Sequence, residues 1–271
     1  MSRFTLLVAG ACAATMGLSI SAPAFAEAPQ GFAGTLSGSY TDWNLKGPND
    51  SANLWSTTGQ AAFGLGQYGM QDLAAEFDGG YHSLSNGSAG NLDIWNAGGH
   101  LFWAPAAPYR LGATLQYEGL SSGGFGTHLW QYGAFGEYYV NDMITLGLNG
   151  GAWSGPHGSF GSGNSGGYVG GGATAYVMPD LALTGQINYF SGSNAHLTSY
   201  SAQAEYLVSE TTPVSVFGGY TFTDVPGPGS HINEWLIGVK FYTNGNGTTL
   251  VDKHRDGALD NLVRPVLPMG E

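Results

Sequence analysis

Residues 130–153 read Trp130-Gln-Tyr-Gly-Ala-Phe-Gly-Glu-Tyr-Tyr-Val140-Asn-Asp-Met-Ile144-Thr-Leu-Gly-Leu-Asn-Gly-Gly-Ala-Trp153. Apolar side chains alternate with small or polar ones on both sides of Asn141-Asp142. A period of two predicts β-strands, and a short Asn-Asp break between two such arms predicts a hairpin. Each arm is about ten residues long and has Trp or Tyr near an end, which is typical of a tilted strand that crosses a membrane.

The same alternating unit recurs along the chain after residue 30. Twelve segments show it: 31–43, 55–66, 73–83, 92–103, 109–119, 128–140, 143–154, 167–177, 181–191, 197–208, 214–223 and 232–243. We predict a strand in each segment, with boundaries correct to a few residues.

The connections between these segments are of two alternating kinds. The shorter ones are rich in Pro, Asn or Asp, which favour turns, and lie near 67–72, 104–108, 141–142, 178–180 and 209–213. The longer ones are rich in Gly and Ser and lie near 44–54, 84–91, 120–127, 155–166, 192–196 and 224–231. Short turns on one side and longer loops on the other are typical of barrels that cross an outer membrane. The pattern predicts an even number of strands, with both ends of the barrel on the periplasmic side.

The first 26 residues have the pattern of an export signal. Arg3 is followed by an apolar run over residues 4–20, and Ala24-Phe25-Ala26 fits a small-x-small cleavage site. We therefore expect the mature chain to begin at Glu27. The only cysteine, Cys12, would leave with the signal, so we expect no disulfide in the mature protein.

The composition indicates a protein that faces lipid. Glycine is very frequent (46 residues), charged residues make up only 10% of the chain and aromatic residues 13%. A soluble domain carries about 25% charged residues. No apolar run of about 18 residues follows the signal, so a closed barrel is the remaining way to satisfy every backbone group in lipid. Disorder, the alternative for a glycine-rich chain, is disfavoured by the regular aromatic alternation.

The export signal, the twelve segments and the last predicted strand, Glu234–Tyr242, together resemble a Gram-negative outer-membrane β-barrel of the porin-like type. The resemblance implies an all-β, antiparallel up-and-down transmembrane barrel of about twelve strands, with roughly 10–14 allowed by the tolerance at the boundaries. The expected division is a signal peptide over 1–26, a barrel over 27–243 and a periplasmic C-terminal tail over 244–271. Such barrels commonly end on the aromatic residue of the last strand, whereas this chain continues to Glu271.

The tail is polar and holds Lys253, Arg255 and Arg264, three of the six basic residues that follow the signal. Residues 252–263 could form a short helix. A mobile periplasmic extension is the simplest prediction for such a segment. Packing into the barrel interior, or a part in assembly, is the alternative.

Tryptophan placement predicts two aromatic girdles at the membrane surfaces. Six tryptophans lie near the longer connections and one lies beside a shorter connection, and they are Trp43, Trp55, Trp95, Trp130, Trp153, Trp235 and Trp103. Aromatic residues that merely favoured strands would be spread evenly along them, so we interpret these as girdle residues.

Strand parity directs a set of polar side chains into the barrel. Near the shorter connections we expect a charge cluster in the lumen, made of Glu76, Asp78, His100, Arg110, Glu137, Glu205 and Lys240. Nearer the external mouth we expect Glu118 and Glu234. A polar interior means water or a hydrogen-bonded plug of side chains, and about twelve strands predict a narrow, partly occluded lumen.

Three short motifs carry less weight. Residues 64–69 fit a dinucleotide-binding glycine pattern, but a strand follows them where that pattern needs a helix. Residues 163–167 fit G-x-S-x-G in a loop so rich in Gly and Ser that a match is expected by chance. The segment around His82 resembles the His-Ser-Asn segment of outer-membrane lipid hydrolases, but its nearest serines do not share a lipid-facing side with His82. Several other histidines lie near predicted loops without the spacing of metal ligands.

We therefore predict a passive, narrow diffusion channel for small hydrophilic solutes that weakly prefers cations, and not an enzyme. The preference follows from an excess of carboxylates over bases in the lumen. The alternatives are a non-conducting structural or surface barrel and a lipid-modifying enzyme. Expected partners are outer-membrane lipid, the export and barrel-assembly machinery and the solutes. No cofactor, metal or nucleic acid is expected, and the sequence leaves the substrate and the oligomeric state open.

Overall fold

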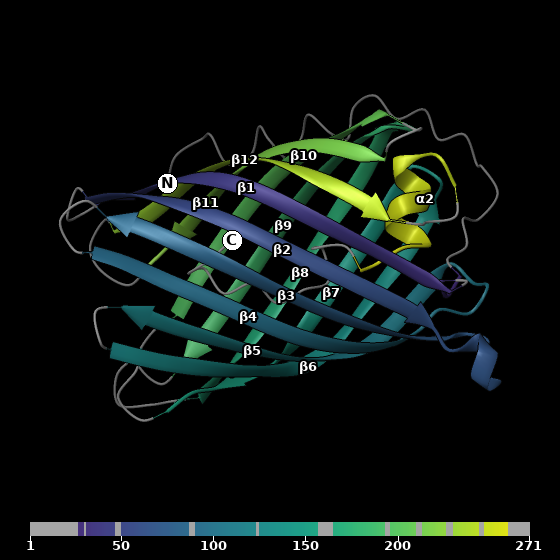
Figure 1. The fold of residues 1–271 in the computed structure, drawn as a ribbon, viewed down its shortest axis with the longest axis horizontal. Helices are drawn as coiled ribbons and strands as arrows, with labels where there is room; N and C mark the ends of the chain where they lie inside the picture. The colour runs from purple at the N-terminus through teal and green to yellow at the C-terminus, as the bar shows by residue number, and fades with distance from the viewer. Residues whose placement is uncertain are drawn as a thin grey trace.

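The computed structural model describes residues 27–29, 31–46, 50–86, 90–122, 125–156, 165–192, 196–209, 213–225, 230–243 and 247–259. Within them the chain forms one closed antiparallel barrel of twelve strands, in which each strand pairs with its neighbours in sequence and β1 pairs with β12 (Figure 1). The strands are β1 (Phe32–Lys46), β2 (Asp50–Gly64), β3 (Leu73–Asn86), β4 (Gly90–Trp103), β5 (Tyr109–Ser122), β6 (Phe125–Asn141), β7 (Ile144–Ser154), β8 (Ser165–Met178), β9 (Leu181–Gly192), β10 (His196–Ser209), β11 (Val214–Asp224) and β12 (His231–Thr243). All twelve predicted strands are confirmed.

The alternation of β6 and β7 appears in the structure as the predicted inside and outside faces. On β6, Trp130 and Tyr138 are 42% and 53% exposed, whereas Gln131 and Glu137 are 2% and 3% exposed. The turn between the two strands is held by a hydrogen bond of 2.9 Å from the Met143 backbone N–H to the Asn141 side-chain oxygen. Asparagine favours such turns because its side chain can bond to the backbone two residues further on. The local sequence therefore fixes this hairpin and the direction of its side chains.

The strands run further than predicted at one end of the barrel. Strands β1 to β6 continue through most of the Gly- and Ser-rich segments that were predicted as long loops, because backbone ladder bonds do not need large side chains. The predicted alternation of short and long connections is therefore wrong for most of the barrel: the connections 47–49, 87–89, 123–124 and 193–195 at this end are shorter than the connections 65–72 and 104–108 at the other end. We call this end the loop end, and the end with the connections 65–72, 104–108, 142–143, 179–180 and 210–213 the turn end.

The turn end also holds the start of β1, the end of β12 and two short helices (Figure 1). One is the 3-10 helix η1 (Gly66–Tyr68), which ends at Gly69 with a positive φ of 82° that glycine adopts without strain. It occupies the segment that matched the dinucleotide pattern, which is therefore a turn between two strands.

The other helix, α2 (Leu250–Arg255), lies at the mouth of the barrel (Figure 1). It begins with a capping box, in which the Thr249 hydroxyl accepts the Asp252 backbone N–H and the Asp252 carboxylate accepts the Thr249 backbone N–H. Such a box satisfies two backbone donors at the helix start. The helix was predicted to begin at 252 and begins two residues earlier. In the described residues no helix has the length and apolar character needed to cross a membrane.

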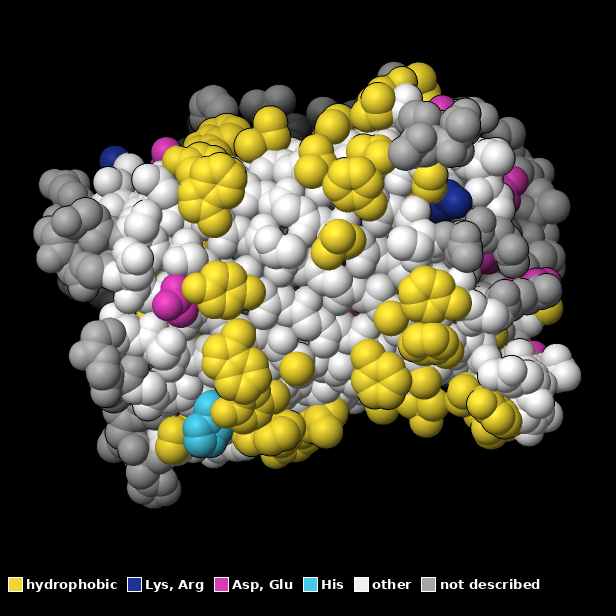
Figure 2. All heavy atoms as spheres, viewed as in Figure 1, with side chains coloured by type: hydrophobic (Ala, Val, Ile, Leu, Met, Phe, Trp, Pro, Cys, Tyr) yellow, Lys and Arg dark blue, Asp and Glu magenta, His cyan; other side chains and the backbone are white. Residues whose placement is uncertain are grey.

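Many large hydrophobic side chains are exposed on the outer surface. On the face that Figure 2 shows they lie in groups among backbone and uncharged side chains, and charged side chains are few. Five tryptophans are among the exposed apolar side chains, namely Trp55, Trp95, Trp103, Trp130 and Trp235. These positions agree with the predicted girdles. Trp43 and Trp153 do not, because they share strand parity with the buried interior residues Thr41 and Asn149. Both lie on the interior face near the loop end, so their assignment to the girdle is corrected.

Candidate functional site in the barrel interior

The structure places all nine predicted lumen residues on the interior face of the strands. Seven of these form the interior charge cluster near the turn end: Glu76, Asp78, His100, Arg110, Glu137, Glu205 and Lys240. They do not form one ring of free charges. They divide into three groups, each on neighbouring or nearly neighbouring strands. Two of the groups contain an ion pair, and the third joins a carboxylate to a histidine.

The first group pairs Arg110 on β5 with Glu137 on β6, which lie directly opposite each other in the strand register. The guanidinium Nη2 is 2.5 Å from Glu137 Oε2, and the two side chains are 0% and 2% exposed. Arg110 Nε donates to the same oxygen at 2.8 Å, and the Tyr139 hydroxyl donates to it at 2.7 Å. A pair buried this deeply is costly to break, because the partner left behind would keep an uncompensated charge.

The second group surrounds Glu205 on β10. Lys240 Nζ on β12 donates to its Oε2 at 2.8 Å, and the Ser215 hydroxyl on β11 donates to its Oε1 at 2.5 Å. The Tyr242 hydroxyl also donates to Oε1. The Glu205 carboxylate is thus held by three donors from two adjacent strands, a strongly satisfied arrangement.

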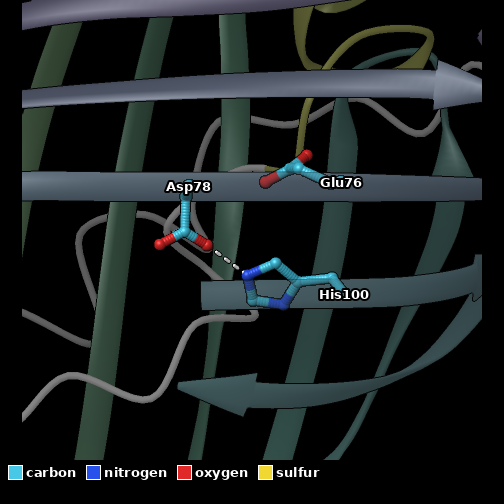
Figure 3. A group of neighbouring side chains, drawn as sticks. All are labelled: Glu76, Asp78 and His100. Atoms are coloured by element: carbon cyan, nitrogen blue, oxygen red, sulfur yellow. Dashed lines mark hydrogen bonds and ion pairs between the residues drawn. The ribbon is translucent and has the colours of Figure 1, made fainter. Parts of the chain in front are cut away.

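The third group joins Asp78 on β3 to His100 on β4, whose Nε2 bonds to Asp78 Oδ2. Glu76 lies two residues before Asp78 on the same face and is directly opposite His100 in the register. Figure 3 shows these three side chains together on the wall of the barrel.

The C-terminal segment, Thr249–Leu259, covers this cluster. Leu250, His254, Arg255 and Leu259 are at most 6% exposed. A free, mobile tail was predicted from its polarity, and these contacts contradict that prediction for the described part of the tail. Residues 260–271, including Arg264, lie outside the described residues.

His254 ties α2 to the Glu205 group. Its Nδ1 is 3.1 Å from the Tyr176 hydroxyl, its Nε2 is 3.1 Å from the Tyr242 hydroxyl, and Nε2 is 3.6 Å from Glu205 Oε2. Its backbone carbonyl accepts a hydrogen bond of 3.4 Å from Arg110 Nη2. One residue of the segment therefore contacts two of the three groups.

Arg255 binds the β6–β7 hairpin from inside. Its Nη2 donates to the Asn141 carbonyl at 2.7 Å and to the Thr145 hydroxyl at 3.2 Å. Its guanidinium carbon lies 5.0 Å from the Tyr139 ring centre and 5.4 Å from that of Tyr176, the geometry of a cation–π contact. Arg255, which belongs to the tail that was predicted to be mobile, is thus buried and anchors the C-terminal segment to the barrel wall.

The end of the segment reaches the Glu76 group. The Leu259 backbone N–H donates to Glu76 Oε2 at 2.6 Å, and Gln60 Nε2 donates to the Leu259 carbonyl at 3.4 Å. The Leu259 side chain packs with Phe102 and Phe135, while Leu250 packs with Tyr176 and Leu207 at the other end of the segment. Apolar contacts at both ends and polar contacts between them fix the segment across the turn end.

Towards the loop end the interior is different. Gln131 Oε1, Glu118 Oε1 and the Tyr168 hydroxyl are buried and find no hydrogen-bond partner among the described residues. Glu234 is 7% exposed and faces the same interior. Buried polar groups are normally satisfied, so groups of this kind are suited to water or a polar solute.

His82 belongs to this interior as well. Its Nδ1 is 2.8 Å from the Ser56 hydroxyl and its Nε2 is 3.1 Å from Asn96 Nδ2, so its partners come from β2 and β4. In the hydrolases that this segment resembles, the histidine faces lipid. His82 faces the barrel interior instead, so it does not form that arrangement. Sequence spacing could not reveal these partners, because they lie 26 and 14 residues away.

No family model matches the sequence, and no curated protein does so either. Solved structures do match the fold. An outer-membrane channel from Pseudomonas putida F1 has a TM-score of 0.60 at 10% identity, over 84% of this chain and 99% of that one. The KdgM porin has a TM-score of 0.52 at 9% identity, over 77% and 99% of the two chains. The β-domain of the Bordetella autotransporter BrkA has a TM-score of 0.50 at 10% identity, over 78% and 98%. The chain therefore has the fold of an outer-membrane, porin-like β-barrel.

Proposed function

We propose that the protein is a narrow outer-membrane channel for small hydrophilic solutes, whose turn-end mouth is closed by its own C-terminal segment. The observation that carries the proposal is the polar interior. An apolar outer wall surrounds buried polar groups that, towards the loop end, have no hydrogen-bond partner among the described residues. A barrel built only as a support could fill that interior with apolar side chains. The fold shared with solved porins and channels supports the same class of function.

The proposed orientation puts the turn end in the periplasm, after removal of residues 1–26 by the export machinery and insertion by the barrel-assembly machinery. The start of β1 and the end of β12 both lie at the turn end, which is the arrangement expected of a barrel with an even number of strands whose ends face the periplasm. Cysteines at Ser121 and Asp142, which lie at opposite ends and are exposed, test this orientation. The Ser121→Cys protein should react with an impermeant thiol reagent on intact cells, and the Asp142→Cys protein should not. The reverse labelling would contradict the orientation.

The proposed channel weakly prefers cations. In the interior charge cluster four carboxylates, Glu76, Asp78, Glu137 and Glu205, face the fixed cations Arg110 and Lys240. In the C-terminal segment Asp252 and Asp256 balance Lys253 and Arg255, so the segment leaves the excess unchanged. Acidic side chains at a constriction favour cations, and low-dielectric walls strengthen the field.

A non-conducting structural barrel is the second candidate, and the docked C-terminal segment favours it, because the segment occupies the mouth that a solute would use. Conductance in planar bilayers separates the two. We compare the full chain with a chain that ends at Thr248. For a channel, the shortened protein should conduct strongly and the full chain weakly or intermittently. Absence of conductance in a shortened protein that is folded and heat-modifiable would support the structural barrel.

A further inference from the structure

We propose that Glu76, Asp78 and His100 form a binding site for a divalent transition-metal ion, Zn²⁺ by its ligand chemistry, in the wall of the barrel (Figure 3). One ligand atom from each residue lies within 4.8 Å of the others. Imidazole nitrogen and carboxylate oxygen are both ordinary Zn²⁺ ligands, and small movements of the side chains would bring them to about 2.0–2.2 Å from one ion. This proposal does not depend on whether the barrel conducts ions.

The strand register creates the cluster. Glu76 and Asp78 share the interior face of β3 because they are two residues apart, and His100 on β4 lies directly opposite Glu76. All three are therefore held by a hydrogen-bonded sheet, and strands position ligands more firmly than loops do. No short ligand motif in the sequence marks the site, because the third ligand comes from the neighbouring strand.

The two carboxylates are already oriented. Glu76 Oε2 accepts the Leu259 backbone N–H at 2.6 Å, and Asp78 lies over Gly98, where a Cβ atom would come within 2.6 Å of Asp78 Oδ2. Gly98 therefore provides the space that the Asp78 carboxylate occupies. Hydrogen bonds that orient ligating side chains are a regular feature of metal sites in proteins.

Burial and charge favour a cation in this position. Glu76 and His100 are 0% and 5% exposed, so the group lies away from bulk water. The buried Nδ1 of His100 has no hydrogen-bond partner among the described residues, so the contact of Nε2 with Asp78 is the one polar contact described for the ring. Glu76 and Asp78 bring two carboxylates to the site, with Arg110 as a neighbouring cation that interacts with Glu76, so a bound divalent ion would meet two carboxylate ligands and one imidazole. To bind the ion through Nε2, the imidazole would carry its single ring proton on Nδ1, so that the Nε2 lone pair faces the ion.

The test uses the full-length, refolded protein after treatment with EDTA. Zn²⁺ binding is measured by competition with a chromogenic chelator, and X-ray absorption at the zinc edge reports the ligand atoms. We expect one tight site with one imidazole and oxygen ligands. Asp78→Asn and His100→Gln should each weaken binding on the order of 100-fold, since even outer-shell partners are worth about 10–100-fold.

Glu118→Gln is the matched control, because Glu118 is an interior carboxylate outside the cluster and should bind Zn²⁺ like the unmodified chain. Three histidines at the loop end, His128, His196 and His231, are replaced together by Gln to remove adventitious Zn²⁺ binding. The tight site should persist in this variant. A chain that ends at Thr248 should bind about tenfold more weakly, because it lacks the Leu259 donor. Heat-modifiability shows that each variant is folded. Absence of a tight site, or unchanged affinity in folded Asp78→Asn protein, would overturn the proposal and leave an Asp78–His100 ion pair only.

Discussion

The two halves of the barrel interior are built from the same kinds of side chain but are satisfied differently. In the turn half, charges pair across neighbouring strands and are covered by the C-terminal segment, as with Glu137, Arg110 and His254. In the loop half, Glu118 and Gln131 keep buried oxygens without a hydrogen-bond partner among the described residues. In the turn-half cluster the atoms of this kind, Arg110 Nη1 and His100 Nδ1, belong to side chains that are paired through another nitrogen. The turn half therefore behaves like a protein core with a buried polar network, and the loop half like the wall of a water-filled space.

The largest difference between the halves is expected when a carboxylate is removed. Glu137→Ala leaves the fully buried Arg110 guanidinium without its carboxylate, which costs about 3–5 kcal/mol in the free energy of unfolding. Glu118→Ala in the loop half should cost less than about 1 kcal/mol, since it strands no buried opposite charge. Denaturant unfolding of both variants in the same lipid measures the contrast. Equal losses would show that the two halves are not built differently.

The next largest effect concerns the anchor of the C-terminal segment. Arg255→Ala removes hydrogen bonds to the Asn141 carbonyl and the Thr145 hydroxyl, and bonds of charged groups are worth about 1.5–3 kcal/mol. We expect α2 to exchange its amide hydrogens faster while the barrel strands keep their protection. Val251→Ala, which changes a partly buried side chain of the same helix, is the control. Unchanged exchange in the Arg255 variant would mean that the segment is held by its apolar ends alone.

A smaller effect is expected on ion preference. Glu118→Gln replaces one ionisable carboxyl of the loop half, for which no ion pair is described, by a neutral amide. In the chain that ends at Thr248, this substitution should lower the cation-to-anion permeability ratio by less than about twofold. The difference between the substituted and unsubstituted chains should become smaller at higher salt, which screens the charges. Reversal potentials in a potassium chloride gradient measure the ratio. A reversal potential of anionic sign before the substitution would contradict the interior charge count.

The smallest effect is a pH dependence of docking. Burial, with the neighbouring Asp252 charge as the next cause, raises the pKa of Asp256 to about 6. A raised pKa favours the docked state when the carboxyl is protonated. This contribution is complete below about 3.9, the ordinary pKa of aspartate, and is lost as the pH rises through about 6. Exchange at α2 should therefore slow between pH 7 and 5 relative to an Asp256→Asn variant. A steeper slowing in the Asn variant would refute the assignment to Asp256.

The strands and the interior residues could be predicted from sequence because both depend on a local signal of period two. Trp153 shows that the same signal could have corrected one error, since it shares parity with the interior residues Thr145 and Asn149. For Trp153, nearness to a strand end and the face of the strand lead to different predictions, and the structure agrees with the face. The longer strands were missed because Gly and Ser carry no apolar alternation, although their backbones pair equally well.

The docked C-terminal segment could not be predicted in this way. Arg255 and Thr145 are 110 residues apart, and Leu259 and Glu76 are 183 apart. A short polar helix with mixed charges has no sequence periodicity that indicates which surface it packs against. The ordinary prediction for such a helix is that it is exposed to solvent. The one available signal was the excess of carboxylates inside the barrel, because the tail holds half of the basic residues that follow the signal. The Glu76, Asp78 and His100 cluster could not be predicted for a similar reason, because His100 comes from the neighbouring strand.

The docking of the C-terminal segment is tested most directly by an engineered disulfide between α2 and the wall. Leu250 and Ala182 belong to one buried apolar cluster, and the mature chain offers no competing cysteine if Cys12 leaves with the signal. The protein carrying Leu250→Cys and Ala182→Cys should form an internal disulfide in nearly every folded molecule. The matched pair Leu250→Cys and Leu183→Cys should not, because Leu183 faces outwards and is 41% exposed. Failure of the first pair to cross-link in folded, heat-modifiable protein, with position 250 freely reactive to a thiol reagent, would contradict the docked segment.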